Sequence, residues 1–276
     1  MKKSIKTFLK HPTKDSSNRS ANPAVIRAST ILFNSMQELY QHEKKIKKHQ
    51  KISHYSYGRY GSSTTIELEN ILKELEQAFH VFLTGTGFGG VALAIMSLCR
   101  PGDEIIVSDN VYGPTKEISE KLLKEFNVIA KFYNPESFED LKNKVTKKTK
   151  MILVENPGSN TFEFQDLSKI VNLAKKKKIF TFLDNTWGTP LYLKPLKLGF
   201  DMSFSSATKY FSGHSDAMGG SLAVNKKVFK QIMFFYKLSG YRMSADEAYL
   251  IIRGLRTLDT RLNQHYENTK QIINFL

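Results

Sequence analysis

The feature that most constrains the fold is an alternation of short apolar segments with amphipathic helical segments along most of the chain. The expected strands cover 80–83, 104–107, 128–133, 151–154, 179–183, 202–205 and 221–224. Thr64-x-x-Glu67 fits a capping box before the first helix, and later helices are expected at 91–98, 116–126, 138–144 and 167–178. Such alternation is typical of an α/β domain with a mostly parallel sheet flanked by helices.

Cysteine usage and the lengths of the apolar runs narrow the class of protein. The single cysteine, Cys99, excludes an intramolecular disulfide and a cysteine-based zinc site, and we predict no metal site. No apolar run reaches the ~18 residues of a transmembrane helix. The basic N-terminal segment lacks the apolar core of a secretory signal. These observations predict a soluble, cytoplasmic protein without a membrane partner.

The net charge of +15 raises the question of an anionic partner. Residues 1–51 form a lysine-rich arm, whereas the remainder is less basic. Only 8 of the 41 basic residues are arginine, the residue that makes most bidentate contacts with bases and phosphates. The pattern therefore favours a lysine-rich surface, or a basic cleft for an anionic cofactor, over nucleic-acid binding. A basic interaction protein remains the alternative that is not an enzyme.

A glycine-rich segment, Gly85–Gly90, lies between an expected strand and an expected helix. Its G-x-G-x-x-G spacing is that of a dinucleotide site, and Asp103, Glu104 or Asp109 lies near the offset of a ribose-binding acid. Backbone N–H groups at a helix N-terminus can hold any phosphate, and glycine permits its close approach. A tight turn without a ligand is a further alternative.

Two other strand ends carry reactive side chains. Asp184 follows the apolar segment 179–183, and the strand at 202–205 runs into Ser206, Thr208 and Lys209. Ligands bind at this edge of open α/β sheets. A lysine there can form a Schiff base, and an acid can keep a pyridine nitrogen protonated. Together with the glycine loop, these residues suit pyridoxal phosphate, whereas a dinucleotide would leave Asp184 and Lys209 unexplained.

Nine ordered motifs add a family resemblance. They are 55–59 (YSYGR), 85–90 (GTGFGG), 101–103 (PGD), 112–113 (YG), 155–159 (ENPGS), 184–187 (DNTW), 206–210 (SATKY), 213–216 (GHSD) and 253–258 (RGLRTL). The chain resembles the Cys/Met-metabolism family of pyridoxal-phosphate enzymes, and within it the bacterial cystathionine β-lyase branch. The resemblance implies the aspartate aminotransferase-like fold, fold type I, and β-elimination of L-cystathionine to homocysteine, pyruvate and ammonia in methionine biosynthesis.

The resemblance also implies roles for matching residues. Lys209 would bind the cofactor covalently and move the substrate Cα proton. Asp184 would pair with the ring nitrogen, and Tyr112 would stack on the ring. The phosphate would be held by the backbone N–H groups of Gly87 and Phe88 and by the hydroxyls of Ser206 and Thr208.

Assembly and domain organisation are implied in the same way. Tyr57 and Arg59 would reach the phosphate of a neighbouring subunit, giving a homodimer or homotetramer with shared active sites. We expect residues 1–59 to form an arm that contacts the partner subunit, 60–256 to form the large cofactor-binding domain, and 257–276 to begin a C-terminal domain.

The chain is shorter than members of the family that it resembles, and this difference leaves several functions open. Family members continue into a C-terminal domain of roughly a hundred more residues, which holds the arginine that binds the substrate α-carboxylate. We therefore expect this small domain to be largely missing through truncation. The alternatives are a remnant that keeps the cofactor pocket without turnover, cysteine desulfhydration, and alanine racemisation.

Overall fold

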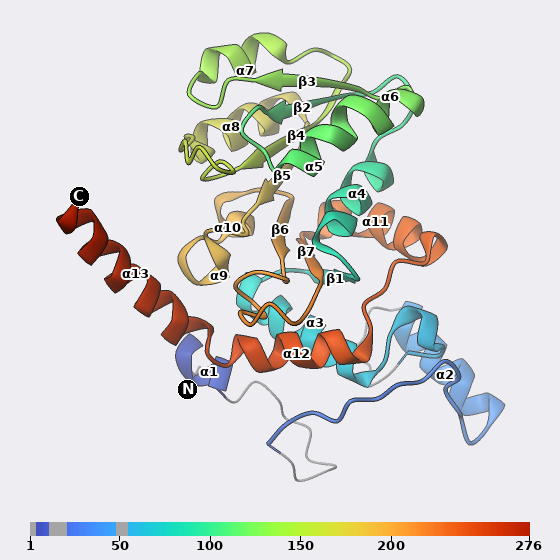
Figure 1. The fold of residues 1–276 in the computed structure, drawn as a ribbon. Helices are drawn as coiled ribbons and strands as arrows, with labels where there is room; N and C mark the ends of the chain where they lie inside the picture. The colour runs from blue at the N-terminus through green and yellow to red at the C-terminus, as the bar shows by residue number, and fades with distance from the viewer. Residues whose placement is uncertain (1–3, 11–20, 48–54) are drawn as a thin grey trace.

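The protein is built around one seven-stranded sheet, which the computed structural model shows together with its flanking helices (Figure 1). The structure describes residues 4–10, 21–47 and 55–276. The strands are β1 (His80–Thr84), β2 (Glu104–Ser108), β3 (Ile129–Tyr133), β4 (Thr149–Glu155), β5 (Phe180–Asp184), β6 (Met202–Ser206) and β7 (Gly220–Val224). Their order is β1-β7-β6-β5-β4-β2-β3, and only β7 runs against its neighbours. The predicted mostly parallel α/β sheet is confirmed.

This topology brings many strand ends to one edge of the sheet. β1, β2, β4, β5 and β6 all run in the same direction, so the loops after them emerge together. β7 starts at that edge, with Gly220 opposite both Thr84 and Ser206. The chain therefore gathers residues from distant parts of the sequence along this single rim.

Helices cover both faces of the sheet because strand side chains alternate between them. One face packs against α4 (Gly87–Leu98), α11 (Lys226–Ser239) and the continuous helical segment α5 (Gly113–Glu117), η2 (Ile118–Leu122) and α6 (Leu123–Glu125). The other face packs against α3 (Ser63–Glu76), α12 (Ala245–Leu255), α7 (Phe138–Lys144) and α8 (Leu167–Lys177). Val81 and Leu83 of β1 face α3, whereas Phe82 between them faces α4.

Several details differ from the sequence-based expectation. The helix α3 begins after Ser62, whose N–H donates to Thr65 Oγ1 at 2.9 Å, so the expected capping box at Thr64 is wrong. The Thr64 hydroxyl instead holds the N-terminal segment, donating to Ala24 O and accepting from Ile26 N. The short helices η1 (Gly58–Tyr60), α9 (Thr189–Tyr192) and α10 (Pro195–Leu198) were not predicted.

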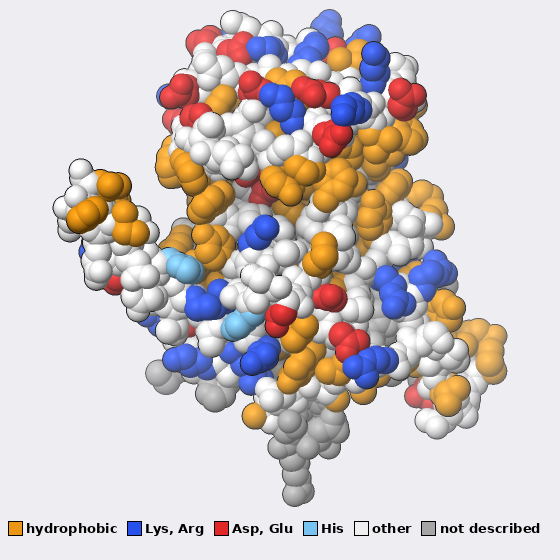
Figure 2. Space-filling view, viewed as in Figure 1, with side chains coloured by type: hydrophobic (Ala, Val, Ile, Leu, Met, Phe, Trp, Pro, Cys, Tyr) orange, Lys and Arg blue, Asp and Glu red, His pale blue; other side chains and the backbone are white. Residues whose placement is uncertain are grey.

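The N-terminal helix lies beside the start of the last helix (Figure 1). α1 (Ile5–Lys10) buries Leu9 against the core that includes Leu258 and Leu262 of α13 (Leu258–Phe275). The rest of α13 projects away from the body, and Figure 2 shows apolar side chains gathered at its free end. α2 (Met36–Lys47) lies on the opposite side of the molecule.

The expected boundaries of the arm and domains remain a prediction, and 1–3, 11–20 and 48–54 of that arm lie outside the described residues. In the described ranges, we find no helix whose length and apolar content would let it cross a bilayer.

Candidate active site

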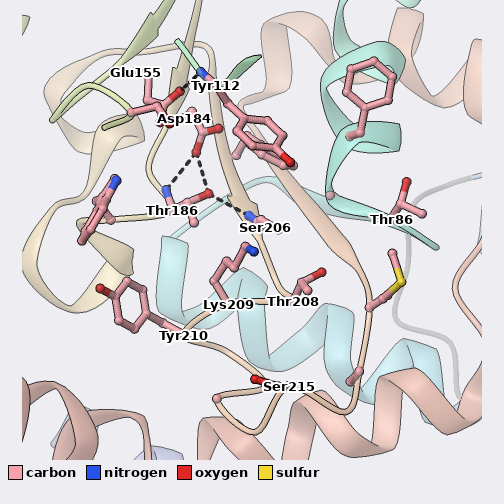
Figure 3. A pocket seen from close by; sticks show the side chains of 18 of the residues that line it. Thr86, Tyr112, Glu155, Asp184, Thr186, Ser206, Thr208, Lys209, Tyr210 and Ser215 are labelled. Carbon is pink, nitrogen blue, oxygen red and sulfur yellow. Dashed lines mark hydrogen bonds between the residues drawn. The ribbon is translucent and has the colours of Figure 1, made fainter. Parts of the chain in front are cut away.

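A cavity of about 1250 Å³ opens at the shared rim of the sheet (Figure 3). Its walls come from the loops after β1, β2, β4, β5 and β6, and from the start of α13. Seven of the nine predicted site residues line it: Gly87, Phe88, Tyr112, Asp184, Ser206, Thr208 and Lys209. The fold thus collects in one hollow side chains that are spread over much of the sequence.

The floor of the cavity holds a buried acid at the end of β5. Asp184 Oδ1 accepts hydrogen bonds from Thr186 Oγ1 at 2.6 Å and from Thr186 N at 3.0 Å. Thr186 Oγ1 accepts in turn from Ser206 N at 2.9 Å, so one hydroxyl links β5 to β6 (Figure 3). Burial raises the pKa of Asp184, and the two hydrogen bonds from Thr186 oppose that rise. A positive charge placed beside this carboxyl group would favour its ionised form.

A second buried acid lies beside Asp184. Glu155 ends β4, and its Cα pairs with that of Asp184, so both side chains leave the same face of adjacent strands. Glu155 Oε2 accepts a hydrogen bond from the backbone N–H of Tyr112 at 2.7 Å. Burial and the neighbouring Asp184 raise the pKa of Glu155. Like charges on adjacent strands disfavour double ionisation of the pair.

Lys209 lies in the turn that follows β6. Its backbone N–H donates to Ser206 O at 3.1 Å, and its carbonyl accepts from Gly213 N at 2.8 Å. The amine points toward Thr186 and Ser206 across the cavity (Figure 3). Within the described ranges, the Lys209 Nζ atom makes no hydrogen bond and no ion pair. It is therefore available to react with a ligand.

An anion cradle lies at the N-terminus of α4. Among the described residues, the backbone N–H groups of Gly87 and Phe88 have no hydrogen-bond acceptor, as is usual in a first helical turn. A Cβ on Gly87 would lie 2.5 Å from Ser206 Oγ, and one on Gly220 would lie 2.7 Å from Thr86 O. Glycine is thus needed at 220, where β7 meets the backbone of this turn, whereas at 87 the close neighbour is a hydroxyl that can rotate. Thr208 Oγ1 accepts from Gly219 N at 3.0 Å and lies along the same wall.

Tyr57 and Arg59 lie outside this cavity. Arg59 Nη1 donates to Lys237 O at 3.0 Å, and its guanidinium group lies 4.8 Å from the centroid of the Tyr60 ring. The structure therefore does not bring these two predicted residues to the site of their own chain. Their contact with a neighbouring subunit stays a prediction.

The acids that a dinucleotide site would use also lie elsewhere. Glu104 pairs with Lys131 at 2.8 Å and Asp109 pairs with Lys116 at 2.5 Å, and neither acid lines the cavity. Asp103 does not line it either. No cluster of three or more metal-ligating acids, histidines or cysteines occurs in the described parts of the chain.

Sequence reasoning missed Glu155, Thr186 and the aromatic side of the cavity. Glu155 and Thr186 belong to the motifs, yet the patterns assign them no role, although Glu155 follows an apolar segment as Asp184 does. Trp187 and Tyr210 line the cavity with their ring centroids 6.2 Å apart, and Phe162, which is not part of that lining, packs edge to face on Trp187 at 5.1 Å. Spacing in the sequence carries no signal for such contacts between loops.

The cavity fits pyridoxal phosphate. It offers unpaired N–H groups and a hydroxyl for a phosphate, an unpaired amine for the aldehyde carbon, and a buried acid for the ring nitrogen. The sheet and this set of groups define a pyridoxal-phosphate enzyme of fold type I.

Comparison with known proteins identifies the family to which the chain belongs within this class of enzymes. The family model described as Cys/Met metabolism PLP-dependent enzyme matches residues 6–276, and the chain belongs to this family. It is 33% identical to a cystathionine beta-lyase of Bordetella avium, covering 99% of this chain and 70% of that protein. It is 32% identical to an L-alanine/L-glutamate racemase of Wolbachia pipientis, covering 93% and 64%.

Solved structures agree with this assignment. A cystathionine gamma synthase from Xanthomonas oryzae matches 100% of this chain and 69% of its own chain, with a TM-score of 0.90 and 28% identity. The chain spans 62% to 71% of the length of three curated relatives that it matches, one described as "Cystathionine beta-lyase" and two as "Putative cystathionine beta-lyase".

Proposed function

We propose that this protein is a carbon–sulfur lyase that cleaves the Cβ–S bond of L-cystathionine. With one water consumed, the products are homocysteine, pyruvate and ammonia. The observation that carries the proposal is the meeting of Lys209, Asp184 and the α4 N-terminus in one cavity. The similarity to the Bordetella avium lyase supports this choice within the family.

In this proposal, pyridoxal phosphate is held by residues from five segments. Lys209 Nζ binds the aldehyde carbon, Asp184 pairs with the ring nitrogen, and Tyr112 covers the ring. The phosphate is bound by the remaining cradle groups, which are the N–H groups of Gly87 and Phe88 and the hydroxyls of Ser206 and Thr208. Tyr57 and Arg59 of a neighbouring subunit would complete it in a homodimer or homotetramer.

When bound, the cofactor supplies an electron-withdrawing ring that stabilises negative charge at the substrate Cα. Lys209 Nζ would be the base that accepts the substrate Cα proton. A protonated ring nitrogen would favour the charged form of Asp184, and the two hydrogen bonds from Thr186 favour the same form. Tyr112 shields the ring from water on one face, and the bond from Cβ to sulfur then breaks with its electron pair leaving on sulfur.

Alanine racemisation is the second candidate function. The Wolbachia pipientis racemase is nearly as similar to this chain as the lyase is. Racemisation needs the same removal of the Cα proton and its return to the opposite face, and it involves no leaving group. Trp187 and Tyr210 line the cavity with their ring centroids 6.2 Å apart, and this aromatic wall suits a long thioether better than an alanine methyl group.

The test is an assay of the purified chain with pyridoxal phosphate. L-cystathionine turnover is followed by thiol release, L-alanine turnover by chiral chromatography, and Lys209→Ala is the control. Thiol release that depends on Lys209 supports the lyase. D-alanine formation alone supports the racemase. A cofactor-bound chain that gives neither product would overturn both and identify a remnant without turnover.

A further inference from the structure

We propose that Glu155 is a positioning residue that holds Tyr112 in place and thereby sets how the cofactor ring is seated. The inference rests on the proposed function, because it takes Tyr112 as the residue that covers the ring. The structure contributes the contact between Glu155 and Tyr112, which the sequence did not predict.

Tyr112 depends on Glu155 for its backbone position. It lies in the N-cap position of α5 in a non-helical conformation, with φ −48° and ψ 134°. Its carbonyl accepts from Thr115 N at 2.8 Å and Lys116 N at 3.1 Å, as expected at a helix start. Its N–H points away from the helix and donates to Glu155 Oε2 at 2.7 Å. This bond is the link from Tyr112 to the central sheet (Figure 3).

Glu155 is itself held on two sides. Its N–H donates to Ser108 Oγ at 3.3 Å, and its carbonyl accepts from Gln165 Nε2 at 3.1 Å. Tyr133 OH donates to Gln165 Oε1 at 2.5 Å. Hydrogen bonds hold the Glu155 backbone at the end of β4, so its side chain extends from a fixed point. Tyr112, by contrast, lies in a loop and is half exposed.

The charge of Glu155 depends on the neighbouring Asp184. Glu155 and Asp184 lie side by side, and Asp184 has the two Thr186 donors while Glu155 has one backbone N–H. The donors therefore favour the charged form of Asp184 more than that of Glu155. A neutral carboxyl group still accepts the Tyr112 N–H through its carbonyl oxygen. Glutamine would accept the same bond without a charge, whereas leucine would not.

The experiment measures cofactor binding by the apo chain and is independent of turnover. Glu155→Leu, Glu155→Gln and Glu155→Asp are titrated with pyridoxal phosphate, alone and combined with Tyr112→Ala. The readouts are quenching of Trp187, the single tryptophan, and the circular dichroism of the bound cofactor. Loss of the anchoring hydrogen bond should weaken binding about tenfold in Glu155→Leu and reduce the dichroism, with Glu155→Gln close to wild type. Glu155→Asp, too short to reach Tyr112 N, should behave like Glu155→Leu.

The combination with Tyr112→Ala separates positioning from a general effect on folding. Once the ring is removed, Glu155→Leu should cause no further change in affinity or dichroism. An equal tenfold loss in that background, or wild-type binding and dichroism in Glu155→Leu and Glu155→Asp, would overturn the inference. If Glu155→Leu does not fold, Glu155→Asp decides the matter. A wild-type chain that binds no pyridoxal phosphate would overturn the proposed function and this inference with it.

Discussion

Gly87→Ala tests how the phosphate cradle is built. The added methyl group would lie 2.5 Å from Ser206 Oγ and 3.1 Å from Ser206 Cβ, whereas real contacts need more than 3.0 Å. The hydroxyl can rotate away, so the fold should persist while the hydrogen bond from Ser206 to the phosphate is lost. A hydrogen bond to a charged group contributes about 1.5–3 kcal/mol. Binding of pyridoxal phosphate should therefore weaken roughly 10- to 150-fold.

The assay is a titration of the apo protein with pyridoxal phosphate, followed by quenching of Trp187. Gly113→Ala is the matched control, because a methyl group there meets nothing within 4 Å. Ser206→Ala should weaken binding to a similar extent, and adding Gly87→Ala to it should have little further effect. A Gly87→Ala variant that binds within about twofold of wild type would refute this account of the cradle.

Three further predictions concern the acids and the core. Thr186→Val removes a hydroxyl donor from the Asp184 carboxylate, so the Asp184 pKa should rise further. Pyridoxal phosphate should then bind about tenfold more weakly in the same titration. Thr186→Ser keeps the hydroxyl and should bind nearly as well as wild type. Burial raises the pKa of Glu76 to about 8, so its stabilising contribution is present at low pH and is lost between about pH 4.5 and 8. Denaturant unfolding should show Glu76→Gln gaining stability relative to wild type by up to about 1.4 kcal/mol per pH unit in that range, and parallel pH curves would contradict this. Gly90→Ala places a methyl group 2.6 Å from the Phe204 ring and should destabilise the fold by about 1–3 kcal/mol in urea unfolding; an unchanged midpoint would show that the ring moves freely.

Much of the fold was predictable because its signals are local. Most strands are short apolar runs, and most of the long helices have an apolar face. What local patterns could not predict is the direction of β7, because antiparallel pairing with β1 and β6 is decided by distant segments. The start of α3 was misplaced for a related reason, since Thr64 bonds to the N-terminal segment and not to its own helix.

The site was predictable to the extent that its residues end apolar segments. Asp184 and Lys209 both follow buried strands, and the carboxyl ends of parallel strands share one edge of the sheet, so the sequence alone predicts that the two side chains lie close together. Glu155 also follows a strand, but its importance depends on a bond to Tyr112 that no spacing rule anticipates. Tyr57 and Arg59 differ from these residues, because the role predicted for them lies in a neighbouring subunit and not in the cavity of their own chain.

The position of β7 has a consequence for how the protein matures. β7 is the last strand in the chain, yet it lies between β1 and β6 in the sheet, so it completes the wall between the turn at Gly87 and the end of β6. Contacts between segments that lie far apart in the sequence form slowly, because the chain loses conformational entropy before the contacts stabilise it. A nascent chain lacking residues 220–224 would have no completed cradle. Binding of pyridoxal phosphate during synthesis should therefore begin only after β7 has inserted into the sheet. The time at which the absorbance of the bound cofactor appears would mark that folding step.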